Sequence, residues 1–81
     1  MTRAVDVDEI VELIEEATLS LPGSLAPDTD LAGVKGLDSM GLVSFLGLVR
    51  DVIGVEIAPK ELVRCRTPRD VHAVIAQAAA R

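Results

Sequence analysis

One serine in this chain stands where its surroundings could support phosphate chemistry. Ser39 follows a long loop rich in glycine and proline and precedes the longest amphipathic segment, so it lies at an expected helix N-terminus. The N–H groups of a first helical turn lack partners within the helix, and with the helix dipole they stabilise a phosphate bound or attached there. The neighbouring Asp38 would repel a phosphate, but it suits a modifying enzyme that needs an acid to hold a metal–phosphate substrate. These two residues therefore indicate an anion or modification site.

A purely structural role for Ser39 stays open at this point. Asp-Ser at a helix start is a common capping pair, and the hydroxyl could simply accept a hydrogen bond from a backbone N–H. Judged from the local residues alone, capping is the more frequent role of such a pair. The wider pattern of the chain has to distinguish the two roles.

The other candidate reactive residues, Cys65 and His72, give weaker indications of chemistry than Ser39 does. Cys65 stands between Arg64 and Arg66, which could lower the pKa of its thiol, but a small half-buried residue in a connector is the commoner situation. One cysteine and one histidine cannot form a disulfide framework, a CxxC motif or a Cys/His zinc site. His72 has no partner by motif, and a hydrolase using Ser39 and His72 would lack a recognisable orienting acid. We therefore do not expect an enzyme.

The first expected element is a helix from about Asp6 to Ser20. Its apolar residues recur at steps of three or four, which is the spacing of one helical face: Val7, Ile10, Val11, Ile14, Ala17 and Leu21. Asp6 and Glu9 have the form of a capping box at its start. Pro22 and Gly23 cannot continue a helix, so the segment ends before them.

A loop follows from Pro22 to Asp38, interrupted every few residues by proline, glycine or aspartate. Four apolar residues are interleaved, so we expect the loop to lie over the core: Leu25, Leu31, Val34 and Leu37. The pattern allows a helical turn near Thr29 to Ala32. A loop of this length in a small domain is more often functional than a short connection.

The second main helix is expected from Asp38 or Ser39 to about Ile53. Its core stripe has helical spacing: Leu42, Phe45, Leu46, Val49, Val52 and Ile53. Gly54 supplies the stop, since helices commonly end on a residue in the left-handed conformation. Phe45 is the only aromatic residue of the chain, so the core must be built mainly from aliphatic side chains.

Two further helices are expected after Gly54. A short turn can begin at Pro59 and continue through Val63. The start of a last helix is marked by an N-cap, a first-turn proline and an acid at the third position: Thr67, Pro68 and Asp70. That helix should end near Ala79, and its buried face should contain Val71, Val74, Ile75 and Ala78. The expected fold class is therefore all-α, a small bundle of three main helices and one short helix.

Length and composition limit the alternatives. The chain has 81 residues, enough for one domain (1–81) with a single small core. Its net charge of −5, from 13 acidic and 8 basic residues, argues against binding nucleic acid or an anionic membrane, and favours a partner with a positive docking patch. No run reaches the roughly 18 apolar residues of a membrane span. The first residues turn acidic too soon for a signal peptide, so we expect a cytoplasmic monomer.

The residues around Ser39 resemble a known attachment motif. Leu37-Asp38-Ser39-Met40 is similar to the [LD]-S-[LM] motif of acyl carrier proteins, short acidic helical bundles whose motif serine carries a 4′-phosphopantetheine arm. The likeness covers nearly the whole chain: a helix, a long loop, a motif helix, a Gly-Val-Glu-Ile connector, a short turn and Thr-Pro opening a last helix. The triplet Asp-Ser-Met is weak alone, but its place at the centre of this pattern makes the resemblance specific.

The resemblance implies a role for each residue of the motif. Ser39 would be the nucleophilic hydroxyl that attacks the pyrophosphate of coenzyme A and becomes a phosphodiester, in a step catalysed by a separate phosphopantetheinyl transferase. Asp38 would help that enzyme recognise the site. The thiol at the end of the arm, and not Cys65, would then hold an acyl or aminoacyl group as a thioester.

The outer face of the motif helix is expected to dock on partner enzymes. Met40 and Val43 fall off the core stripe, and exposed apolar residues beside the modified serine suit transient docking on a partner's hydrophobic rim. Gly47 and Arg50 continue this face. Arg50 stands where members of the family often have an acid. The resemblance therefore implies a mixed docking surface and partners that differ from those of a general fatty acid synthase.

The expected function is that of a discrete carrier protein, not itself a catalyst, which delivers a thioester-bound group between enzymes of fatty acid, polyketide or nonribosomal peptide biosynthesis. Its expected partners are the phosphopantetheinyl transferase, a loading ligase or transferase, and downstream condensing or tailoring enzymes.

Two alternatives remain open. One is a D-alanyl or other aminoacyl carrier, which the Ser-Met-Gly form of the motif also fits, although Arg66 stands where the D-alanyl type often has a tryptophan. The other is an unmodified helical interaction module that uses Met40 and Val43.

Overall fold

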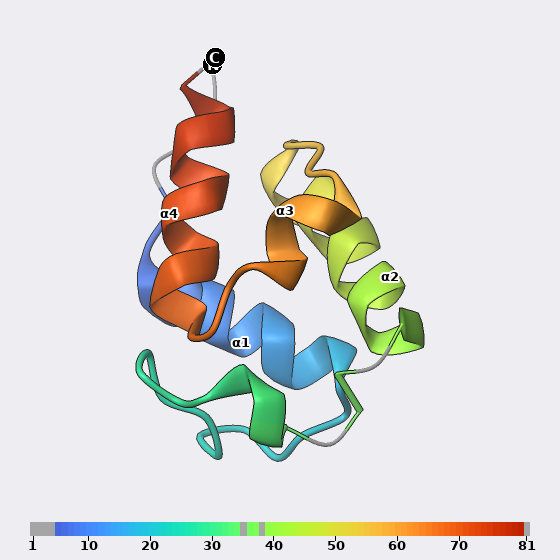
Figure 1. Cartoon of the computed structure of the whole chain (residues 1–81), viewed down its shortest axis with the longest axis vertical. Helices are drawn as coiled ribbons and strands as arrows, with labels where there is room; N and C mark the ends of the chain where they lie inside the picture. Colours follow the sequence, from blue (N-terminus) through green and yellow to red (C-terminus); the bar gives the residue numbers. More distant parts are fainter. Residues whose placement is uncertain (1–4, 35, 38, 81) are drawn as a thin grey trace.

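The computed structural model describes residues 5–34, 36–37 and 39–80, with only the backbone of Ser39 described. Helical segments follow one another along this part of the chain (Figure 1): α1 (Val7–Ala17), the 3₁₀ turn η1 (Leu31–Gly33), α2 (Ser39–Leu48), the π turn η2 (Val49–Ile53), α3 (Pro59–Val63) and α4 (Pro68–Ala79). The described residues contain no strand, which confirms the all-α prediction. Because η2 continues α2 directly, the bundle has three main helices and the short α3, as predicted.

The four α-helices pack around a shared centre. α3 lies between α2 and α4, and α1 crosses below them (Figure 1). α1 contacts both α2 and α4, and α3 contacts the same two helices. The long loop that contains η1 passes along the other side of α1 and returns to the start of α2 (Figure 1).

The core is aliphatic and is centred on the single aromatic ring, as the composition predicts. Every segment of the bundle contributes at least one buried side chain to one cluster: Ile10, Leu13, Ile14, Leu31, Phe45, Val49, Ile53, Val55, Ile57, Leu62, Val71 and Ile75. The apolar residues of the loop also pack against this cluster, with Leu31 buried and Leu25, Val34 and Leu37 partly buried. The prediction that the loop lies over the core is confirmed.

α1 is shorter than the sequence pattern suggests. It ends at Ala17, and Leu19 takes a left-handed conformation with φ of 57°, so the chain turns away before Leu21. Leu21 is therefore 78% exposed, and its predicted place on the buried face is wrong. Asp6 occupies the N-cap position, but its side chain makes no cap hydrogen bond, so the predicted capping box does not form.

The end of the second main helix widens into a π turn. The N–H of Gly54 donates to the carbonyls of Val49 and Arg50, both at 3.1 Å, and its φ of 82° provides the predicted left-handed stop. A π turn rotates the chain less per residue than an α-helix does, because its hydrogen bonds span five residues rather than four. This change carries Val52 out of the core stripe and leaves it 46% exposed, contrary to the prediction.

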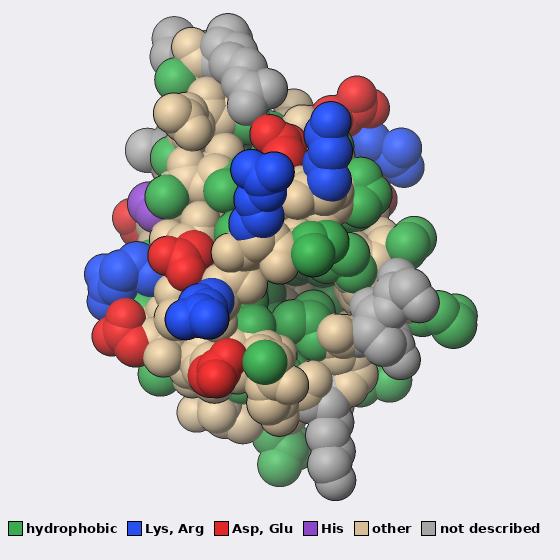
Figure 2. Space-filling view, viewed as in Figure 1, with side chains coloured by type: hydrophobic (Ala, Val, Ile, Leu, Met, Phe, Trp, Pro, Cys, Tyr) green, Lys and Arg blue, Asp and Glu red, His purple; other side chains and the backbone are tan. Residues whose placement is uncertain are grey.

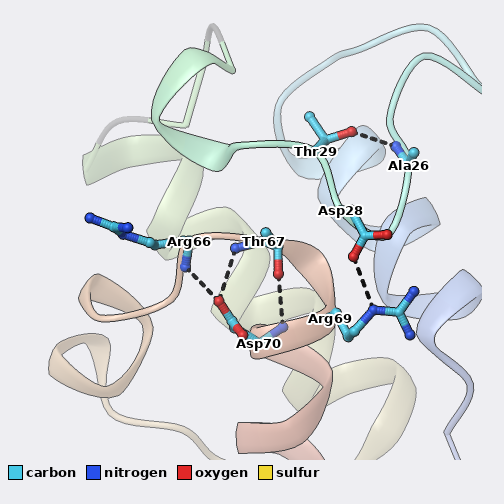
Figure 3. Close-up of polar contacts among 7 residues, drawn as sticks. All are labelled: Ala26, Asp28, Thr29, Arg66, Thr67, Arg69 and Asp70. Carbon is cyan, nitrogen blue, oxygen red and sulfur yellow. Dashed lines mark hydrogen bonds and ion pairs between the residues drawn. The ribbon is translucent and has the colours of Figure 1, made fainter.

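The predicted start of α4 is present in full. The Thr67 hydroxyl accepts a hydrogen bond from the backbone N–H of Asp70 at 3.2 Å, and the Asp70 carboxylate accepts bonds from the N–H groups of Arg66 and Thr67 (Figure 3). Pro68 fills the first helical position. The closed capping box defines where the connector ends and α4 begins.

The loop is attached to this same point. The N–H of Leu31 donates to the Arg66 carbonyl at 2.7 Å, and the N–H of Arg69 donates to the Pro27 carbonyl at 3.0 Å. The Arg69 side chain also forms an ion pair with Asp28 at 3.0 Å (Figure 3). The helical turn predicted at residues 29–32 appears as η1, where the Asp30 carboxylate accepts the N–H of Ala32. The loop is thus held to α4 before it reaches Ser39.

Candidate functional site

Ser39 is the first residue of α2. The sequence pattern predicts a helix start at residue 38 or 39, and the structure confirms it. An N-cap residue precedes the first residue of its helix, so Ser39, as the first residue of α2, is not the cap. The proposed recognition residue Asp38 lies outside the described residues. The backbone of Ser39 is therefore part of the first turn of α2.

A glycine three residues before Ser39 sets the approach of the loop to α2. Gly36 has a φ of 87°, which side-chain-bearing residues rarely adopt. A Cβ atom built on Gly36 would lie 2.8 Å from the carbonyl oxygen of Thr18, at the end of α1. This oxygen belongs to the backbone and cannot move aside easily. The sequence pattern marked Gly36 only as a residue of the loop. Its position three residues before Ser39 was the signal that could have indicated its role in the approach of the loop to α2.

Apolar side chains are exposed next to the attachment position. Met40 is 79% exposed and Val43 is 67% exposed, which confirms that both face outwards. Val63 of α3 is 73% exposed and was missed by sequence reasoning, although its neighbour Leu62 is buried in the core. In a helix of five residues, two adjacent apolar residues cannot both face the core. This was the signal that could have identified Val63.

Three of the four predicted docking residues line one groove between α2 and α3. Val43, Gly47 and Arg50 face residues of the connector and of α3 across an open groove of about 620 Å³. Arg50 is exposed and lies 3.8 Å from the carboxylate of Asp51, a long and solvent-exposed ion pair that contributes little. Met40 does not line this groove and lies next to Ser39 instead.

A second groove opens between η1, α3 and the connector before α4, with a volume of about 780 Å³. Leu37 and Leu42, which flank Ser39 in the chain, form part of its wall. Its lining is apolar on the side of the core and polar at Asp30, Arg66 and Thr67. A flexible chain with amide groups and apolar segments, attached at Ser39, can therefore lie along this groove.

Behind this groove lies a small internal cavity of about 40 Å³. Its walls are almost entirely aliphatic and include the ring of Phe45: Ile14, Leu31, Leu37, Leu42, Phe45, Leu62, Cys65 and Val71. This volume has room for about two or three water-sized groups. A cavity of this volume is too small for a long alkyl chain.

Cys65 lies between these cavities and has the half-buried position that the sequence favours. Its Sγ donates to the carbonyl of Glu61 at 3.6 Å. Burial raises the pKa of the Cys65 thiol, and the carboxylates of Asp70 and Glu61 raise it further. The suggestion that Arg64 and Arg66 lower this pKa is therefore wrong, because both arginines are exposed while the thiol is turned toward the interior. Cys65 is not an activated nucleophile.

The other polar candidates of the sequence are His72 and any cluster of metal-binding side chains. His72 is half-buried on α4, with its Nε2 atom 2.6 Å from the carbonyl oxygen of Val5. The described residues contain no group of histidine, cysteine, aspartate and glutamate side chains able to hold a metal ion. Over the same ranges, no helix combines the length and apolarity needed to cross a bilayer.

Comparison with known proteins identifies the type of site. Residues 8–75 match the family model described as a phosphopantetheine attachment site, so the match spans α1 to most of α4 and includes Ser39. No curated protein matches the chain significantly.

Two solution structures of one carrier from Streptomyces coelicolor share the fold. They are the acetyl actinorhodin acyl carrier protein, at 23% identity with a TM-score of 0.77, and the 3-oxo-butyl form of the carrier from the actinorhodin polyketide synthase, at 24% identity with a TM-score of 0.74. Each alignment covers 99% of this chain and 96% of the other.

Proposed function

The chain belongs to the phosphopantetheine attachment site family, and from this premise we propose that it is an acyl or aminoacyl carrier whose arm is attached to Ser39. The observation that carries the proposal is the position of Ser39, the first residue of α2, where the loop held by Gly36 meets the helix. The family supplies a covalent 4′-phosphopantetheine, whose terminal thiol holds the carried group as a thioester.

The residues of the chain contribute attachment and positioning. The Ser39 hydroxyl oxygen would attack the phosphorus of coenzyme A that bears the pantetheine, with 3′,5′-ADP leaving and the proton passing to a base on the transferase. Asp38, adjacent in the chain, would contribute to recognition by that transferase. The groove beside Leu37 and Leu42 would guide the attached chain along the surface of the bundle. The protein itself would catalyse no step.

We propose a polyketide-type pathway for the carried group. The support is the shared fold of the actinorhodin carrier from Streptomyces coelicolor, whose two structures bear acetyl and 3-oxo-butyl groups. The small volume of the internal cavity supports a short group rather than a long alkyl chain. Partners would be a loading transferase or ligase and condensing or tailoring enzymes, and the carrier would act as a cytoplasmic monomer. An aminoacyl group, including D-alanine, is the alternative cargo.

Partner enzymes would dock on the surface around the arm. Exposure of Met40 and Val43 supports this, because large exposed apolar residues near the site can insert into a partner's pocket. Gly47 and Arg50 line the adjoining groove and would extend the contact. The same exposure also fits an unmodified interaction module, which would bind its partner equally well after Ser39→Ala.

Mass measurement of the intact protein tests the proposal. Co-expression with a permissive phosphopantetheinyl transferase should increase the mass by one phosphopantetheine group, and Ser39→Ala should remove the increase entirely. Ser44→Ala is the matched control, because Ser44 is an exposed serine of the same helix and should leave the modification intact. An unchanged mass of the parent chain, beside a carrier that is modified under the same conditions, would rule out the proposed function.

A further inference from the structure

A third groove, between α1 and the loop that follows it, contains charges of one sign. Its volume is about 650 Å³, and its walls belong to α1 and to residues 20–25. Among its lining residues are four acids and two apolar residues: Asp8, Glu12, Glu15, Glu16, Val11 and Leu25. No lysine or arginine of the described residues lines it. From residue 4 to residue 34 the sequence itself has eight acidic residues and no basic one. We call this groove the α1 groove.

The two grooves described above are mixed in charge. The groove between α2 and α3 contains Arg50 together with Glu56 and Glu61, and the groove beside α2 contains Asp30 together with Arg66. On the face shown in Figure 2, Lys and Arg side chains lie among Asp and Glu side chains. Of these three grooves, the α1 groove is therefore the one whose charge selects the sign of an occupant.

Two acids of the α1 groove stand where a helix favours cations. Glu15 and Glu16 lie in the last turn of α1, at the negative end of the helix dipole, and that turn contains no basic residue. Glu16 also lies four residues after Glu12, a spacing at which like charges on a helix repel. The acids Asp8, Glu12, Glu15 and Glu16 form no ion pair within the described residues. A cation bound in the groove would relieve this repulsion.

Glu15 presents a carboxylate oxygen that can accept a hydrogen bond from such a cation. The residue is only 5% exposed, and its Oε2 atom accepts the N–H of Leu25 at 3.0 Å, which holds the loop against α1. Its Oε1 atom accepts no hydrogen bond from any described residue. No fully buried side-chain oxygen in the described part of the chain lacks a partner, so Oε1 is open to the groove that Glu15 lines.

Val11 gives the same groove an apolar floor. It is 7% exposed and yet is not part of the main core cluster, although it is on α1 with Ile10 and Ile14, which are. It lines the groove together with Leu25, which is partly buried. An occupant therefore meets apolar side chains at the floor and carboxylates around them.

We propose that the α1 groove binds a segment of a partner protein in which an arginine stands beside an apolar side chain. The guanidinium would donate to Oε1 of Glu15 and lie near Glu12 and Glu16, and the apolar side chain would contact Val11 and Leu25. Arginine suits this position better than lysine, because its planar group donates parallel hydrogen bonds to carboxylates. The excess of negative charge would also speed the encounter with a basic segment.

This inference goes beyond the proposed carrier function and does not require the arm. No residue of α2 or α3 lines the α1 groove, so a partner bound there would leave the surface of both helices free. A carrier held in this way would stay attached to one protein while its arm reached another.

The test uses the full chain and two synthetic amphipathic helical peptides. Both have leucines on one face, flanked by arginines in one peptide and by citrullines in the other. Citrulline keeps the shape of arginine and lacks its charge. The arginine peptide should shift the amide resonances of residues 8–16 and 20–25 in the ¹⁵N-labelled protein, and the citrulline peptide should bind about tenfold more weakly. Added salt should weaken the arginine peptide more than the citrulline peptide.

Single neutralising variants locate the contact. Glu15→Gln should weaken the arginine peptide about tenfold, because the amide oxygen can still accept the N–H of Leu25 while the charge is lost. Glu12→Gln changes an exposed residue, which protects the fold, and should weaken the peptide severalfold. Glu56→Gln is the matched control, because it neutralises an exposed acid outside the α1 groove and should leave the affinity unchanged.

Several outcomes would overturn the proposal. They are equal affinity for the two peptides, resonance shifts confined to α2 and α3, or an affinity that neither Glu15→Gln nor Glu12→Gln lowers. Displacement of the peptide by calcium chloride, but not by sodium chloride of equal ionic strength, would assign the groove to a metal ion. Self-association in sedimentation that Glu15→Gln abolishes would assign it to a second copy of the chain. Ser39→Ala should bind the arginine peptide as the parent does, so this test and the mass measurement can fail separately.

Discussion

Two helices of this chain start beside a hydroxyl-bearing residue, but the residue has a different position in each: Thr67 precedes the first residue of α4, whereas Ser39 is the first residue of α2. At α4 the Thr67 hydroxyl is the cap, and an acid at the third helical position completes the capping box. At α2 the hydroxyl residue is already the first helical residue, and the first turn contains no acid. The Thr67 hydroxyl closes the start of its helix, whereas Ser39 lies within the first turn of α2.

The two helix starts cannot be distinguished in the sequence, but the structure separates them. Asp-Ser and Thr-Pro look equally like helix starts in the sequence, and both can be explained by capping. In the structure, the Thr67 hydroxyl accepts the N–H of Asp70, while Ser39 is a residue of the helix itself and precedes an exposed methionine. A hydroxyl needed for modification has to stay accessible, and its helix must be held by something other than that hydroxyl.

The largest expected effect distinguishes a hydroxyl that caps a helix from one that is modified. Ser39→Ala should abolish phosphopantetheine attachment, yet change the free energy of unfolding by no more than about 0.5 kcal/mol, because alanine is well tolerated within a helix. Thr67→Ala should do the reverse, with attachment retained and a loss of about 1 kcal/mol. Intact mass and urea unfolding measure the two quantities. A Ser39→Ala protein as destabilised as Thr67→Ala would mean that Ser39 is a structural cap after all.

A second prediction concerns two glycines, Gly36 in the loop before α2 and Gly54 directly after η2. Gly36 and Gly54 have nearly the same φ, 87° and 82°, but only Gly36 has a neighbour close to the position of a Cβ. Gly54→Ala should cost only the left-handed strain, about 1 kcal/mol. Gly36→Ala should lower the free energy of unfolding by about 2–3 kcal/mol, because the steric contact with the Thr18 backbone adds to the left-handed strain.

Urea unfolding of the two glycine variants tests this difference. Attachment to Gly36→Ala should also slow, since the loop before Ser39 has to shift. Equal losses of stability would show that the 2.8 Å approach to Thr18 carries no energetic weight.

Sequence patterns predicted the parts of this fold that depend on neighbouring residues. The capping box at Thr67, the proline start at Pro59 and the glycine stop at Gly54 are local features, and the structure confirms each of them. Leu21 and Val52 were assigned wrongly because an early helix end and a π turn changed the helical register. Periodicity assumes one constant turn angle, so it fails wherever packing alters that angle.

The site was predictable to a similar degree. The position of Ser39 and the exposure of Met40 and Val43 follow from the pattern along one helix. The role of Gly36, the exposure of Val63 and the direction of the Cys65 pKa depend on residues far away in the chain or on depth within the bundle. For Cys65, the adjacent arginines suggested a thiol with a lowered pKa. Burial and two nearby carboxylates raise that pKa instead.

The smallest expected effect concerns Cys65, which lies next to the closed start of α4. Its raised pKa leaves less thiolate than in free cysteine at any pH below that pKa, so iodoacetamide should alkylate it more slowly. Since burial is the largest cause and Asp70 the second, Asp70→Asn should lower the pKa only partly and speed alkylation modestly. Arg64→Gln, which leaves Asp70 in place, is the control and should change the rate less.

The same thiol provides an internal reference for the modified protein. Cys65 is the only cysteine of the chain, so the unmodified protein should show one slow phase of alkylation. The arm on Ser39 adds a second thiol with an ordinary pKa, and the modified protein should show an additional fast phase. Ser39→Ala should lose the fast phase and keep the slow one. A fast phase in the unmodified protein would contradict both the enclosed position of Cys65 and the contrast between the two helix starts.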